Sequence, residues 1–151
     1  MRYTAGGRTA ATAATADNIG GELWNPASNK GIRVFVVNWT KQGAATADNP
    51  GLVRITTKGT STLTVTPDLD NSYDRDATPP SAATLELTFS AQPTIAGPYL
   101  MRTNLAAALG TGFTWVFSGD GLLVPAGTGI AVATPVATVL QAGDVTFEWG
   151  E

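Results

Sequence analysis

Three apolar runs in the last third of the chain decide the fold: Phe113-Thr114-Trp115-Val116-Phe117, Gly121-Leu122-Leu123-Val124-Pro125-Ala126-Gly127-Thr128-Gly129-Ile130-Ala131-Val132 and Val145-Thr146-Phe147-Glu148-Trp149. Side chains alternate along an extended chain, so the large residues of the first and last runs each share one face. In the middle run, a proline and glycines form a turn between two short strands, because proline ends a strand and glycine accepts positive φ. This arrangement predicts an antiparallel β-sandwich.

The strongest strand pattern upstream runs from Ile32 to Trp39 and is apolar on both faces. One face carries Ile32, Val34 and Val36, and the other carries Phe35, Val37 and Trp39. Strands of this kind are normally covered by helices on both sides, but this chain has almost no helical pattern. We therefore expect one face to meet loops, an N-terminal arm or another subunit. The predicted interface residues are Ile32, Val34, Val36, Trp39 and Trp24.

The remaining elements are short. Residues 52–57 and 62–66 predict a hairpin around Lys58-Gly59-Thr60, and residues 84–90 predict a strand with Leu85, Leu87 and Phe89 inward and Glu86 outward. The segment Asn104–Leu109 has a capping asparagine and a leucine pair at helical spacing, which predicts one short helix at most. Short strands punctuated by turns are typical of an all-β, two-sheet sandwich of the jelly-roll kind, with an immunoglobulin-like sandwich as the alternative.

The domain organisation follows from length and composition. A chain of 151 residues fits a single domain. Residues 1–18 are rich in Ala, Thr and Gly and predict an arm or an edge strand, and residues 19–151 predict one sandwich domain. We find no apolar segment typical of a signal peptide or a membrane span, so we expect synthesis in the cytoplasm and no membrane partner.

The composition disfavours several classes of function. Only 14% of the residues are charged, and the net charge is −3 with nine Lys and Arg spread along the chain. Nucleic-acid binding needs clustered cations, so we expect no such partner. The chain has no histidine and no cysteine, which removes the commonest general base and the imidazole and thiolate metal ligands. We expect no cofactor and no enzymatic activity.

Two weaker candidate sites involve carboxylates. The segment from Asp68 to Asp76 could offer Asp68, Asp70, Asp74 and Asp76 to calcium, although its spacing does not match an EF-hand and a solvated turn is the alternative. Glycoside hydrolysis needs two suitably separated carboxylates, but the pattern favours no particular pair among Glu22, Glu86, Glu148 and Glu151.

The four tryptophans, Trp24, Trp39, Trp115 and Trp149, could form a platform on which sugars stack. Three of the four alternate with other apolar residues, which favours packing in the core or at an interface.

The sequence resembles small jelly-roll structural proteins of tailed bacteriophage virions, which include head decoration (cement) proteins and related fibre or tail components. The resemblance is carried by Leu23-Trp24-Asn25-Pro26, Ile32-Arg33-Val34, the run from Gly121 to Val132 and the closing run from Val145 to Trp149. It implies a non-enzymatic virion protein, a homotrimer that attaches to the major capsid protein or another virion protein and decorates or stabilises the capsid. The alternatives are a carbohydrate-binding fibre or tail module and a polysaccharide-degrading enzyme.

Overall fold

Strands account for all the regular structure in the described part of the chain. The structure is a computed structural model that describes residues 2–65 and 81–151. The strands are β1 (Arg2–Arg8), β2 (Asn18–Asn25), β3 (Ile32–Lys41), β4 (Gly51–Ile55), β5 (Thr60–Val65), β6 (Thr84–Ala91), β7 (Ile95–Arg102), β8 (Gly112–Val116), β9 (Leu122–Val124), β10 (Thr128–Thr134) and β11 (Gly143–Gly150). The prediction of an all-β fold is confirmed.

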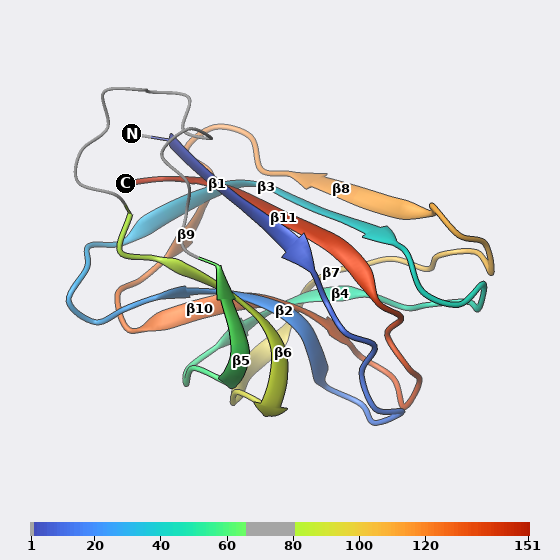
Figure 1. The fold of residues 1–151 in the computed structure, drawn as a ribbon. Helices are drawn as coiled ribbons and strands as arrows, with labels where there is room; N and C mark the ends of the chain where they lie inside the picture. Colours follow the sequence, from blue (N-terminus) through green and yellow to red (C-terminus); the bar gives the residue numbers. More distant parts are fainter. Residues whose placement is uncertain (1, 66–80) are drawn as a thin grey trace.

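The strands form two antiparallel sheets that pack face to face as a sandwich (Figure 1). The first sheet has five strands in the order β1-β11-β3-β8, and β9 pairs with the first part of β3. The second sheet has six strands in the order β5-β6-β2-β10-β4-β7. The predicted two-sheet sandwich is therefore confirmed.

The core lies between the sheets and is built from the alternating residues of the central strands. In β11, Val145, Phe147 and Trp149 are buried, as their spacing predicts. The Trp149 ring stacks on Tyr3 of β1, with 5.9 Å between ring centroids. In β8, Trp115 is buried and its ring centroid lies 3.8 Å from that of Phe113. The aromatic face predicted for this segment therefore points into the sandwich.

A β-bulge changes the two-faced pattern of β3. In the pairing with β11, Glu148 lies opposite Val36 and Trp149 lies opposite Val34, so Phe35 is an extra residue on β3. One extra residue exchanges the faces of the strand beyond it. As a result Ile32 and Val34 before the bulge and Val37 and Trp39 after it all point into the same core. Most of the large apolar side chains of this strand are therefore buried within one sandwich, without a second subunit.

Two local connections differ from their predictions. Residues 58–60 do not close a hairpin, because β4 and β5 are separated in their sheet by β6, β2 and β10. The turn at residues 125–127 joins strands of different sheets, since β9 pairs with β3 and β10 pairs with β2 and β4. In a sandwich, burial of both inner faces decides which strands pair, and turn residues fix only where the chain reverses.

No helix forms near Asn104–Leu109. The backbone of Leu105 instead exchanges hydrogen bonds with Asp48, at 2.8 and 3.2 Å, and residues after it form a turn. This pairing occupies the Leu105 carbonyl that would accept a bond in the first turn of a helix, so tertiary contact overrides the local helical propensity.

The N-terminal segment contains an edge strand. Strand β1 pairs with β11 from Arg2 opposite Gly150 to Arg8 opposite Asp144, so the two ends of the chain lie side by side (Figure 1). Tyr3 and Ala5 of β1 are buried in the core. Removing this strand would therefore damage the sandwich itself, whereas a detached arm could be removed with little effect on it.

Candidate functional site

The predicted interface residues divide into two groups. Ile32, Val34 and Trp39 have no exposed surface and belong to the core, which corrects the prediction that they contact a partner. Val36 and Trp24 are half-buried, on outer faces of their sheets. The physical reason is the bulge at Phe35, which brings both apolar halves of β3 to the inner face.

Of the predicted calcium ligands and the tryptophan platform, the described residues include only the tryptophans. The predicted calcium ligands Asp68, Asp70, Asp74 and Asp76 lie outside the described residues. Within residues 2–65 and 81–151, no three side chains of metal-binding type come close enough to hold an ion together. Among the tryptophans, Trp39, Trp115 and Trp149 are buried and only Trp24 is half-buried, so these residues form no open platform for sugar stacking.

The structure brings together two carboxylates that the sequence left unpaired. Glu22 of β2 lies directly opposite Glu86 of β6, and both side chains point away from the core that Leu23, Leu85 and Leu87 fill. Both residues are fully buried. The sequence predicted that Glu86 points outward, but it did not predict that the side chain is buried. The pairing register carries this information, and no pattern within either strand could have revealed it.

Different partners stabilise the two carboxylates. The Gly59 amide donates to Glu22 Oε1 at 3.1 Å and to Oε2 at 3.3 Å. Glu86 has more partners than Glu22. Lys58 Nζ lies 2.6 Å from its Oε1, and the hydroxyls of Thr64 and Thr84 donate to its carboxylate at 2.5 and 2.8 Å.

These environments separate the two pKa values. Burial raises the pKa of Glu22 to about 7, and the negative charge of Glu86 adds to the effect, while the bond from Gly59 opposes it. Burial also tends to raise the pKa of Glu86, but the bonds from Lys58, Thr64 and Thr84 outweigh it and the pKa is lowered. A pair with separated pKa values is typical of acid–base sites. Because both carboxylates are fully buried, this pair offers no surface to a polysaccharide. Its two members instead change folding stability with pH in opposite directions.

A second buried charge pair ties two loops together. Lys41, at the end of β3, donates to the carbonyl oxygens of Thr46 and Ala106, the latter at 2.8 Å, and lies 3.7 Å from Asp48 Oδ2. Neither side chain of the Lys41–Asp48 pair is exposed to solvent. Burial raises the pKa of Asp48, and the positive charge of Lys41 opposes that shift.

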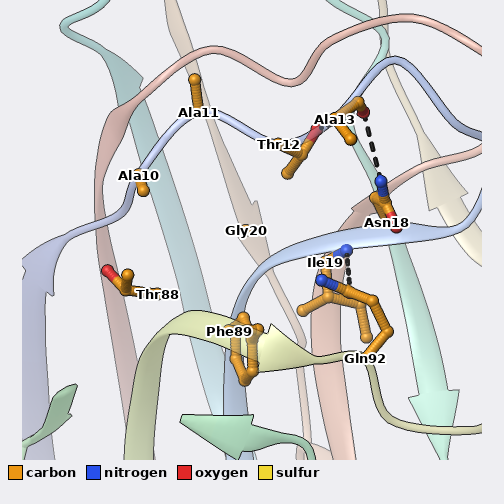
Figure 2. Close-up of a pocket in the computed structure, with 10 residues that line it drawn as sticks. All are labelled: Ala10, Ala11, Thr12, Ala13, Asn18, Ile19, Gly20, Thr88, Phe89 and Gln92. Carbon is orange, nitrogen blue, oxygen red and sulfur yellow. Dashed lines mark hydrogen bonds between the residues drawn. The ribbon is translucent and has the colours of Figure 1, made fainter. Parts of the chain in front are cut away.

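A cavity of about 260 Å³ lies where β6 separates from β2 (Figure 2). Its wall consists of residues 10–13, residues 18–20 of β2, and Thr88, Phe89 and Gln92 at the end of β6. Strand β2 pairs with β6 only from Gly21 opposite Leu87 to Trp24 opposite Thr84. Beyond Leu87, β6 is no longer paired with β2 and stays paired with β5, with Ser61 opposite Phe89 and Thr60 opposite Ala91.

Thr88 forms the bend at which the two strands separate. Its φ is +56°, a left-handed conformation that is a rare exception for a β-branched residue. Such strain costs on the order of 1–3 kcal/mol and is commonly retained at functional positions. The sequence predicted an unbroken strand here, and a threonine in a strand gave no signal of the bend.

Replacing Thr88 by glycine is therefore expected to raise the free energy of unfolding by about 1 kcal/mol, because relief of strain exceeds the entropy that glycine loses on folding. Urea denaturation measures the change. The control is Thr4→Gly in β1, where φ is not positive and about 1 kcal/mol should be lost. Equal losses in both variants would show that Thr88 carries no strain.

The fold and these sites define an all-β sandwich protein with buried carboxylates, one lysine–aspartate pair and a small neutral cavity. Comparison with known proteins finds no matching family model, no matching curated protein and no matching solved structure. None of the described residues forms a helix of the length and hydropathy required to cross a membrane.

Proposed function

We propose that this protein is a non-enzymatic structural component of a virion, which associates with itself and attaches to a phage capsid to decorate or stabilise it. The sequence resemblance suggests this role, and an open sheet edge in the structure supports self-association. The two-faced pattern of β3 no longer supports a partner, because the bulge places most of the apolar side chains of that strand in the core. Self-association is therefore inferred from the open edge.

The supporting observation is the edge formed by β8 and β9, at which Arg54 of β4 donates from Nη1 to the Leu123 carbonyl of β9 at 2.8 Å. Neither strand contains a charged residue or a proline, and among the described residues only β3 pairs with them. Val116 on β8 is 69% exposed and Leu123 on β9 is 41% exposed. Soluble proteins usually protect such edges with charges, prolines or bulges, since an open edge invites another strand.

Two other edges carry that protection. Strand β1 begins and ends with arginine, and its Arg8 forms an ion pair with Asp144 at 2.8 Å. Strand β7 contains Gly97 with positive φ, followed by Pro98, and it ends at Arg102. The contrast with β1 and β7 favours the β8–β9 edge as a place where a neighbouring copy adds its own backbone. The remaining edge, β5, is also uncharged and exposes Leu63 at 47%, so it is the second candidate.

The substitution Val116→Lys tests this edge. We expect wild-type protein at micromolar concentration to sediment at about three times the 15.5 kDa chain mass, and the variant to sediment as a monomer, because a lysine at the edge opposes strand addition. The control is Val136→Lys, which places the same charge on another exposed valine and should leave the assembly intact.

The outcomes separate the edge from the function. An assembly that survives Val116→Lys would exclude the β8–β9 edge and leave self-association standing. Cryo-microscopy of the particle tests the virion role, for which we expect ordered copies at repeating positions on the shell. A protein that is monomeric in solution and absent from such positions would contradict the proposal.

A further inference from the structure

The cavity between β2 and β6 is formed by specific interactions on each side of the gap. Where β6 leaves β2, the Ile19 amide no longer faces a strand and instead donates to Gln92 Oε1 at 2.7 Å. Next to it in β2, Asn18 Nδ2 donates to the Ala13 carbonyl of the 10–13 segment at 3.2 Å, and in that segment Thr12 Oγ1 accepts from the Leu140 amide at 3.0 Å. The gap is therefore held open by side chains that replace the missing strand pairing (Figure 2).

The chemistry of the wall is entirely neutral. It combines two carboxamides, two threonine hydroxyls, the half-buried ring of Phe89 and small alanine and glycine residues, with no charged side chain. A charged ligand would lose its hydration there without a counter-charge, which is costly. Binding sites for small molecules usually combine an apolar wall with a few placed polar groups, and this cavity has that composition with a volume slightly below their usual range of about 300–1,000 Å³.

A neutral ligand with several hydroxyl groups and one apolar face suits this wall best. Carboxamides both donate and accept hydrogen bonds, and hydroxyls do the same, so they match groups that can act in either sense. The Phe89 ring offers a surface for C–H groups. Together with the strained bend at Thr88 that opens the gap, these features describe a pocket for one sugar ring.

We infer that the cavity lined by Ala10, Asn18, Thr88, Phe89 and Gln92 binds a single neutral pyranose unit. The site is distinct from the β8–β9 edge, so it stands or fails independently of the proposed structural function. This site is also separate from the four tryptophans that were considered as a sugar-stacking platform, three of which are buried. A virion protein with this site would contact neutral glycans through a single shallow subsite.

Amide chemical-shift titration of the full-length protein tests the inference. The probes are the methyl glycosides of glucose, galactose, mannose and N-acetylglucosamine, each added to about 50 mM so that millimolar Kd values are reached. We expect at least one probe to give saturable shifts at Ile19, Gly20, Phe89 and Gln92. Glucuronate, a charged pyranose, should bind at least about tenfold more weakly than that probe.

A blocking variant makes the result specific to the cavity. Ala10 lines the cavity and is exposed, so Ala10→Trp should fill the space without disturbing the core and raise Kd by at least about tenfold. The matched control is Ala14→Trp, on an exposed residue of the same segment that does not line the cavity. Absence of saturable shifts with every neutral probe, equal binding by Ala10→Trp, or equal or stronger binding of glucuronate would each overturn the inference.

Discussion

Replacing Lys41 by methionine is expected to lower the free energy of unfolding by about 3–5 kcal/mol, because it leaves Asp48 as a buried charge without its counter-ion. Methionine preserves most of the apolar stem but removes the donor to Thr46 and Ala106. Two loops that Lys41 holds together, residues 42–50 and 103–111, lose this connection as well. Equilibrium unfolding in urea measures the loss.

The pH dependence of this loss gives a second readout. The pKa of Asp48 is already raised by burial, and removing Lys41 raises it further, so the folded variant holds a proton that the unfolded chain releases. Stability of the variant then falls as pH rises above the ordinary aspartate pKa of 3.8. We expect the deficit relative to wild type to be larger at pH 7 than at pH 4.

Matched variants separate the charge effect from a change in packing. Lys30 is exposed, so Lys30→Met should change stability by no more than about 0.5 kcal/mol. Adding Asp48→Asn to Lys41→Met should recover part of the loss, because a carboxamide costs less to bury than a carboxylate. A loss below about 1 kcal/mol for Lys41→Met would contradict a buried, charged pair.

Replacing Glu22 by glutamine is expected to stabilise the protein at pH 8 by roughly 3 kcal/mol. The folded protein raises the pKa of Glu22 from 4.5 to about 7, so between these values the folded state binds more protons than the unfolded state. Wild-type stability therefore falls as pH rises through this window, by roughly 3 kcal/mol for the full shift, and stays reduced above it. Glutamine removes the titration and still offers an oxygen to the Gly59 amide.

The pH profile of unfolding distinguishes this effect from a general gain in stability. Wild type and Glu22→Gln should have similar stabilities near pH 4 and diverge up to about pH 7. Glu86 acts with the opposite sign, because its lowered pKa contributes stability above the ordinary value of 4.5 that is lost on acidification in both proteins. Asp120→Asn, on an exposed loop residue, should leave the wild-type profile unchanged. A constant difference between wild type and Glu22→Gln at every pH would contradict the buried, protonated Glu22.

The carboxylate pair illustrates what local sequence patterns miss. Glu86 lies in a strand that the alternation of apolar residues identifies, where it is expected to face solvent, and the sequence assigned Glu22 no partner. Only the register between β2 and β6, with the approach of Lys58 and Gly59, shows that both are buried and adjacent. A strand register depends on contacts between residues far apart in the chain, so no periodicity within one strand contains it.

The sequence by itself determined that this chain is an all-β protein of two antiparallel sheets, because the alternation of large apolar residues in β8 and β11 is a local property of an extended chain. Tertiary structure decided which strands pair, that β4 and β5 lie apart, and that Leu105 joins a β-bridge rather than a helix. It also decided that one extra residue at Phe35 turns a two-faced strand into a one-faced strand. The physical reason is that burial is shared among distant segments, so a bulge or a bend such as Thr88 is selected by the whole core and leaves no mark in the local pattern.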